Sequence, residues 1–210
     1  MVNPEELRFI CTRCGNCCTD KDTIVNLTYL DILRLQTGLK IDLKETLEII
    51  GFYVFNNNLS EGTLEKMVVS PIETEKGLAF TGLLKNNLGE CYFYDKKNAK
   101  CLIYQIRPML CRTFPFSFSI SKDIDNKAKG EYEIYYTEKA KFYCPGIGSD
   151  SPIIKYENWI KIGIETLKEL EKNHHFNDNW NKSVKNGKVL PNVRNYISLI
   201  YKNSNEKILV

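Results

Sequence analysis

The chain of 210 residues is poor in histidine, the commonest metal-binding side chain, and contains only His174 and His175. Neighbouring side chains on a helix point about 100° apart, so two adjacent histidines seldom bind the same ion. No pair of histidines has the spacing that a Cys₂His₂ zinc finger needs. We therefore expect both histidines on the surface, at a polar helix end where a cation suits the helix dipole.

Long apolar runs are also missing. No stretch approaches the roughly 20 apolar residues that a membrane-spanning helix needs, and the polar, acidic start Met1–Glu6 does not resemble a signal peptide. The lysines are scattered, with no basic stripe interleaved with aromatic residues, so the formal net charge of +3 does not indicate nucleic-acid binding. We expect a cytoplasmic protein, where thiols stay reduced, with neither a membrane nor a nucleic acid as partner.

Motifs of several enzyme classes are absent from the sequence. There is no Gly-x-Gly-x-x-Gly between a strand and a helix, and no Ser/His/Asp or Cys/His arrangement that indicates a hydrolase. The cysteine triad of the usual radical S-adenosylmethionine enzymes is incomplete, because Lys21 occupies the third position after Cys14 and Cys18. The sequence therefore leaves enzymatic activity undecided.

A content of 43% hydrophobic and 26% charged residues is typical of a globular protein, and the pattern of elements indicates the α+β class. We expect a small cysteine-rich metal-binding core with short antiparallel strands over residues 1–150. An N-terminal helix pair flanks this core. Residues 151–210 form a C-terminal helical extension packed on it.

Helix-start signals place the helices. Thr28 caps a helix from Tyr29 to Thr37 that Gly38 closes, and Asp42 with a capping box begins a second one that ends near Tyr53. Ser151-Pro152 begins a third helix that runs to about Lys172, and a last short helix passes through Tyr196 and Ile200.

Turn residues divide the middle of the chain into short apolar runs that predict strands. These runs are Met67 to Pro71, Leu78 to Leu84, Cys91 to Tyr94 and Lys100 to Ile103. A further hairpin is expected from Phe114 to Ile120 and Glu131 to Thr137, with Lys122 to Gly130 as its exposed loop.

Eight cysteines dominate the chemistry of the chain. Four lie within eight positions, where adjacent residues would form only strained disulfides, and four more follow downstream: Cys11, Cys14, Cys17 and Cys18, then Cys91, Cys101, Cys111 and Cys144. A soft metal or an iron–sulfur cluster is the economical use for them. Eight thiols suffice for two four-ligand sites, or for one site and spare reactive thiols.

The spacing Cys11-x-x-Cys14-x-x-Cys17 is that with which a loop wraps three thiolates round a cubane cluster, and Gly15 eases the loop backbone. The fourth ligand is left open between Cys18, Cys111 and Cys144, the last of which precedes a proline as in bacterial ferredoxins. Structural zinc is the main alternative, since it accepts four cysteines, and thiol redox chemistry is the other.

Two arginines flank Cys111, and both could stabilise a negatively charged cluster. Guanidinium groups beside thiolates favour their charged form, which predicts cluster-supporting roles for Arg107 and Arg112. The alternative is that each arginine makes an ordinary ion pair with a carboxylate. Pro108 fixes the turn that presents Cys111.

These motifs together resemble a known family. Over roughly residues 9–147 the chain resembles the zinc- or iron-chelating CxxCxxCC family, also called YkgJ-like. The resemblance is carried by Cys11-x-x-Cys14-Gly15-x-Cys17-Cys18, then Cys91, then Cys101-x-x-Tyr104-x-x-Arg107-Pro108-x-x-Cys111-Arg112-x-Phe114-Pro115, then Cys144. The resemblance implies that all eight cysteines bind metal and that Tyr104, Arg107 and Arg112 adjoin the cofactor. One branch of the family is similar to flagellin lysine N-methylases, which implies S-adenosylmethionine as a further cofactor to test.

We expect an iron–sulfur protein with one 4Fe–4S cluster, and the remaining cysteines leave room for a second metal site. It would pass electrons to a protein redox partner or serve a cluster-dependent modification such as protein methylation. The alternatives are a zinc-stabilised binding module without catalysis and an iron or sulfur carrier for cofactor assembly.

Overall fold

The computed structural model describes residues 7–55, 68–120 and 132–206, and it confirms the α+β class. The elements are α1 Asn16–Thr19, α2 Tyr29–Leu39, α3 Leu43–Ile49, β1 Ile50–Val54, β2 Ile72–Thr74, β3 Gly77–Leu83, β4 Tyr94–Asp95, β5 Lys100–Cys101, η2 Tyr104–Ile106, α5 Met109–Thr113, β6 Phe116–Ile120, β7 Tyr132–Tyr136, α6 Glu138–Tyr143, α7 Tyr156–Lys185 and α8 Val193–Glu206. In this description no helix is long and apolar enough to cross a bilayer.

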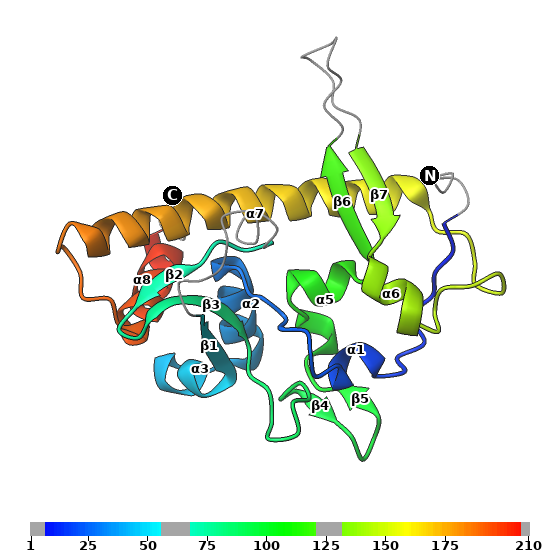
Figure 1. Cartoon of the computed structure of the whole chain (residues 1–210), viewed down its shortest axis with the longest axis horizontal. Coiled ribbons are helices and arrows are strands. Elements are labelled where there is room, and N and C mark those ends of the chain that lie inside the picture. Colours follow the sequence, from blue (N-terminus) through cyan, green and yellow to red (C-terminus); the bar gives the residue numbers. More distant parts are fainter. Residues whose placement is uncertain (1–6, 56–67, 121–131, 207–210) are drawn as a thin grey trace, which may run out of the picture.

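The 30-residue helix α7 runs along the length of the molecule (Figure 1). It contacts β2, α2, α5 and both strands of the β6–β7 hairpin. Figure 1 shows α1, which carries Cys17 and Cys18, and the β4–β5 hairpin, which carries Cys101, on the side of the molecule away from α7. Helix α5, which carries Cys111, lies between them and α7 and contacts α7.

Three antiparallel strands form the largest sheet, in the order β1-β3-β2. Its central strand, β3, pairs Ile50 with Leu83 on one side and Ile72 with Ala79 on the other. The segment that follows the N-terminal cysteines also joins this strand, because Leu27 N–H donates to Thr81 O at 3.0 Å and Leu83 N–H donates to Val25 O at 2.9 Å. These bonds fix the cysteine-bearing loop to the sheet.

Both predicted N-terminal helices begin where their caps place them. Thr28 and Asp42 each form a complete capping box, with Asp31 and Glu45 as the partners. The end of α2 differs from the prediction: Lys40 takes the left-handed conformation, and Gly38 lies inside the helix. A Cβ at Gly38 would lie 2.7 Å from the Ile106 side chain, so this glycine serves packing against η2 rather than termination.

The hydrophobic core joins residues from both ends of the chain. Leu27, Ile32 and Leu35 pack in one cluster with Trp180 and Ile197, and all five are buried. Helix α8 packs against both α2 and α3. The helices after residue 150 thus supply part of the core itself; the boundary between two units at that residue stays a prediction.

A smaller cluster surrounds the second hairpin. The expected pairing of this hairpin is present, with Phe116 opposite Tyr136 and Ile120 opposite Tyr132. Leu7, Phe116, Ile134 and Ile154 form the buried centre of the cluster. The expected loop at residues 122–130 lies outside the described residues, as do Met67 and the N-terminal residues 1–6.

Helix α7 starts later and ends later than the sequence predicts. Ser151-Pro152 does not begin it, because the next residues pair with the N-terminal segment: Arg8 forms an isolated bridge with Ile153, and Ile154 N–H donates to Leu7 O at 2.9 Å. The helix then continues through both histidines to Lys185. His174 and His175 therefore lie within the helix, not at its end, and His174 approaches Asp178 at 3.5 Å.

The middle of the chain also holds two strands that the sequence pattern did not predict. Strand β2 lies at Ile72–Thr74, whereas the expected strand at residues 67–71 is wrong, since residues 68–71 are not strand. The second helix ends at Ile49, and Ile50–Val54 turns into strand β1 where a continued helix was expected. Of the short runs, residues 78–83 form most of β3, whereas those at 91–94 and 100–103 are strand only at Tyr94 and at Lys100–Cys101.

Candidate metal centre

The N-terminal cysteine loop is shaped by two residues with left-handed backbone. Arg13 has φ 56° and Gly15 has φ 81°, and the chain then forms the single helical turn α1. Cys18 N–H donates to Gly15 O at 2.8 Å, which closes this turn. A Cβ at Gly15 would collide with the Tyr94 ring, so only glycine permits the observed contact between the loop and β4.

Backbone hydrogen bonds bring the next cysteines to this loop. Cys91 N–H donates to Cys18 O at 2.8 Å, which connects residues 73 positions apart. In the β4–β5 ladder, Tyr94 stands opposite Cys101. Cys18, Cys91 and Cys101 are therefore placed together by main-chain contacts and not by their side chains alone.

Cys111 arrives on the short helix α5, which begins after Pro108. Met109 N–H, at the start of this helix, donates to the buried Asp31 carboxylate at 2.8 Å. Arg112 N–H donates to Pro108 O at 3.0 Å. The expected turn at Pro108 is thus present, and it is anchored by a carboxylate of α2.

These elements enclose a cavity of about 190 Å³ that we call the cysteine cavity. Six of the eight cysteines line it: Cys11, Cys17, Cys18, Cys91, Cys101 and Cys111. Arg13, Tyr94, Lys100, Tyr104 and Arg107 also line it. Sulfur is therefore the dominant donor of the cavity, and two guanidinium groups and one lysine supply positive charge in its wall.

Three of the thiols share hydrogen bonds. The Cys18 thiol contacts both Cys17 and Cys101, and these bonds lower the pKa of Cys17 to about 7 and that of Cys101 to about 6. The same bonds, with burial, raise the pKa of Cys18. Burial raises the pKa of Cys91, and raises that of Cys111 strongly. The positive charge of Arg107 also favours the thiolates of Cys17 and Cys101.

Cys144 lies on the other side of the N-terminal loop, at the end of α6. Asn16 joins the two segments, because its Nδ2 donates to Tyr143 O at 2.8 Å. Burial raises the pKa of Cys144, and the charges of Cys14, Cys17 and Cys11 raise it further. Neither Cys144 nor Cys14 lines the cysteine cavity.

The two flanking arginines have different surroundings. Arg107 lies over the Tyr104 ring at 3.8 Å, its Nε donates to Tyr104 O at 3.0 Å, and it lines the cysteine cavity. Arg112 instead approaches the Glu169 carboxylate of α7 at 3.8 Å and does not line that cavity. Arg112 thus makes the ion pair with a carboxylate that was the alternative, and its role beside a cofactor stays a prediction.

The donor set suits a thiophilic metal, since thiolates bind zinc, iron and iron–sulfur clusters. In the part of the chain that the structure describes, no group of three or more Cys, His, Asp or Glu side chains is already arranged to hold an ion. Cys11, Cys14 and Cys17 are exposed, and the other five cysteines are half-buried.

Comparison with known proteins identifies the family to which this chain belongs. A family model described as "CxxCxxCC: Putative zinc- or iron-chelating domain" matches residues 10–145. The chain belongs to the CxxCxxCC family. Membership agrees with the resemblance seen in the cysteine spacing, and it supports metal binding without deciding between zinc and iron.

Relatives add little about activity. An uncharacterized protein of Methanocaldococcus jannaschii is 29% identical over 141 residues, which make up 67% of this chain and 59% of that protein. The chain therefore corresponds to somewhat more than half of that relative's length. No solved structure matches the chain significantly.

Two contributors to the site escaped the sequence interpretation. Arg13 lies over the Tyr104 ring at 4.4 Å. In the sequence, only its position between Cys11 and Cys14 connected it with the site. Asp31 was visible only as an acidic residue in the first turn of α2; its contact with Met109 joins residues 78 positions apart. Neither contact has a local sequence signal.

Proposed function

We propose that the protein binds a 4Fe–4S cluster at its N-terminal loop and a second metal beside it, and that the cluster exchanges electrons with a protein partner. The cluster would be held by Cys11, Cys14, Cys17 and Cys144, which we call the loop set. The second metal would be held by Cys18, Cys91, Cys101 and Cys111, which we call the strand set.

The electrostatic neighbourhood of the thiols is the observation that carries this division. Cys144 is influenced by Cys14, Cys17 and Cys11, which are the other members of the loop set. Cys18 is influenced by Cys101 and Cys91 of the strand set. Cys17 acts on Cys18, Cys91 and Cys111 as well as on Cys144, so it lies between the two sets. Because the Cys17 thiol contacts that of Cys18, the two proposed sites would adjoin each other.

The loop set also has the sequence of a cluster site. Cys11-x-x-Cys14-x-x-Cys17 with a remote Cys144-Pro145 is the combination that supports 4Fe–4S. The exposure of Cys11, Cys14 and Cys17 supports electron transfer, because a cluster at the surface is within reach of a docked redox partner. Arg107, in the wall of the cysteine cavity, would offset the negative charge of the thiolates.

The test is the metal and acid-labile sulfide content of protein prepared without oxygen, in wild type and in two cysteine variants. Cys14→Ser should lose the iron and sulfide of the cluster and keep the second metal. Cys91→Ser should do the reverse. Wild-type protein with no sulfide would refute the cluster, and loss of all metal from both variants would refute the division into two sets.

Zinc in both sets is the second candidate, favoured by the family description, which names zinc and iron together. A zinc-stabilised module would be colourless, would contain two zinc ions and no sulfide, and would not exchange electrons. A carrier for cofactor assembly would instead pass its iron or sulfur to an apo-acceptor protein during co-incubation.

A modification reaction such as protein methylation is separated from electron transfer by one further measurement. The electron paramagnetic resonance spectrum of the reduced cluster should not respond to S-adenosylmethionine if the cluster only carries electrons. A changed spectrum would show that the methyl donor binds at the cluster and would replace the electron-transfer role.

A further inference from the structure

A second cavity adjoins the cysteine cavity and has a different chemical character. Its volume is about 370 Å³, within the range of sites that bind small molecules. Cys17, Val25 and Cys111 line both cavities and thus form the wall between them. We call this second space the apolar cavity.

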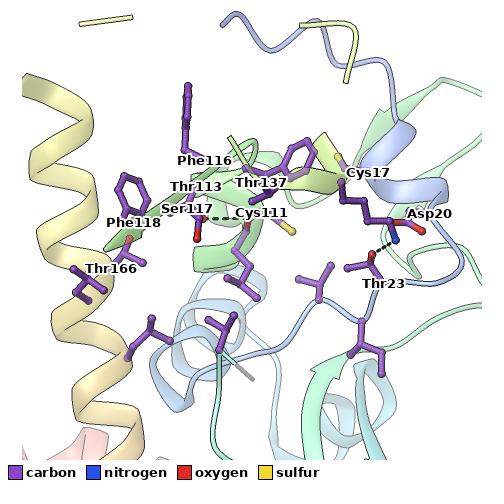
Figure 2. A pocket seen from close by; sticks show the side chains of 18 of the residues that line it. Cys17, Asp20, Thr23, Cys111, Thr113, Phe116, Ser117, Phe118, Thr137 and Thr166 are labelled. Atoms are coloured by element: carbon purple, nitrogen blue, oxygen red, sulfur yellow. Dashed lines mark hydrogen bonds and ion pairs between the residues drawn. The ribbon is translucent and has the colours of Figure 1, made fainter. Parts of the chain in front are cut away.

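Figure 2 shows how the apolar cavity extends between distant elements. Phe118 and Thr166 lie at the end next to α7, and Cys17, Asp20 and Thr23 lie at the other end, with Cys111 between them. The cavity therefore leads from the long supporting helix to two of the cysteines that we assign to metal.

Most of the wall is apolar. Its larger side chains include Ile24, Leu110, Phe114, Phe118, Leu167 and Leu170. They come from the segment after α1, from α5, β6 and α7 and from the residue that follows α5. Apolar walls of this kind bind the body of an organic molecule by removing it from water.

A charged pair lies at the cysteine end. Lys139 Nζ approaches the Asp20 carboxylate at 2.6 Å and also contacts the Thr23 hydroxyl. The pair is thus neutral as a whole, and it offers both donors and an acceptor to a polar group.

We infer that the apolar cavity is a binding site for a small organic molecule that has an apolar body and an uncharged polar end. The body would pack against Leu110, Phe118 and Leu167, and the polar end would meet Asp20 and Lys139. The inference rests on the proposed function only in placing the ligand against metal-bound Cys17 and Cys111.

The test uses N-phenyl-1-naphthylamine, an uncharged fluorophore whose emission rises in apolar surroundings, with the full-length metal-loaded protein. Wild type should bind this probe saturably at one site. Leu167→Trp should weaken binding at least tenfold because the larger side chain occupies the cavity, and Leu170→Trp provides an independent second variant. Leu190→Trp is the matched control, because Leu190 is 71% exposed and does not line the cavity.

Circular dichroism and metal content establish that each variant is folded. Absence of saturable binding by wild type would overturn the inference. Equal binding by wild type and by the folded Leu167→Trp and Leu170→Trp variants would overturn it too.

A second readout connects the ligand to the metal. Bound probe should slow the release of metal to a chelator several-fold, because it covers Cys17 and Cys111, and it should have no such effect in Leu167→Trp. An unchanged release rate in wild type would contradict placement of the ligand against the metal. Probe binding by protein that proves free of metal would refute the proposed function and leave the cavity assignment standing.

Discussion

The carboxylate of Asp31 accepts the backbone N–H of Met109 at 2.8 Å, two residues before Cys111. Asp31 is fully buried, and its carboxylate also accepts Thr28 N–H at 3.2 Å and pairs with Arg34. One side chain thus caps α2 and, at the same time, positions the start of the helix that carries Cys111. This makes Asp31 a positioning residue for the proposed strand set.

Replacing this carboxylate should destabilise the whole protein. Asp31→Ala leaves two N–H groups without their acceptor and leaves Arg34 with Glu169 as its remaining carboxylate partner, and we expect the free energy of unfolding to fall by about 3 kcal/mol. Urea denaturation measures this change. Asp22→Ala is the control, since Asp22 is exposed, and it should stay near wild type. A loss below about 0.5 kcal/mol, the range of ordinary surface substitutions, would contradict the role of Asp31.

The same carboxylate predicts a pH dependence of stability. Burial raises the pKa of Asp31 from 3.8 to about 6, so the folded protein binds this proton more tightly than the unfolded chain. Its contribution is therefore fully present below the unfolded pKa and decreases as the pH rises through about 6. The difference in unfolding free energy between wild type and Asp31→Asn should change over this interval. A difference that is constant from pH 4 to pH 7 would rule the shift out.

Arg107 should control the acidity of the thiols, and Arg112 should not. In metal-free protein, alkylation by iodoacetamide should follow thiolate formation, with midpoints near the pKa values of about 6 for Cys101 and about 7 for Cys17. Arg107→Leu should move both midpoints to higher pH, because the positive charge of Arg107 lowers both pKa values. Mass spectrometry of the labelled peptides gives the midpoints.

Arg112→Leu is the matched control, since Arg112 approaches Glu169 and does not line the cysteine cavity. It should leave both midpoints in place. Equal shifts in the two variants would indicate a general loss of structure instead of a local effect of charge.

Gly15 should be indispensable to the loop. Gly15→Ala forces a side chain into the left-handed conformation and into the Tyr94 ring, and we expect a loss of stability of about 2 kcal/mol together with weaker metal retention. Gly148→Ala serves for comparison, because a Cβ there has open space and its backbone carries no such strain. Thermal unfolding and metal analysis of both variants provide the measurement; similar behaviour of the two would refute the role.

Local signals predicted the helix starts well. Thr28 and Asp42 cap α2 and α3 as expected, because a capping box involves residues only three positions apart. The start of α7 could not be read in this way. Ser151-Pro152 has the composition of a helix start, but the bridge between Arg8 and Ile153 keeps the chain extended there, and that partner is 145 positions away.

Strand β1 was missed for the same reason. Ile50–Val54 continues the apolar spacing of the helix before it, and it is a strand because it pairs with β3. At the site, the cysteines were identified by type and spacing, whereas their neighbours were not. The contact of Cys18 with Cys101 depends on the bond between Cys91 N–H and Cys18 O, which no local pattern encodes.

The close contact between Gly38 and Ile106 connects helix α2 to the segment that carries the metal-site residues. Ile106 immediately precedes Arg107, so a methyl group at residue 38 would displace the segment that leads to Cys111. A variant at this position would register as a defect in metal loading although every sulfur ligand was intact. Mutagenesis confined to the cysteines would miss this effect, and Gly38 would be wrongly regarded as irrelevant to metal binding.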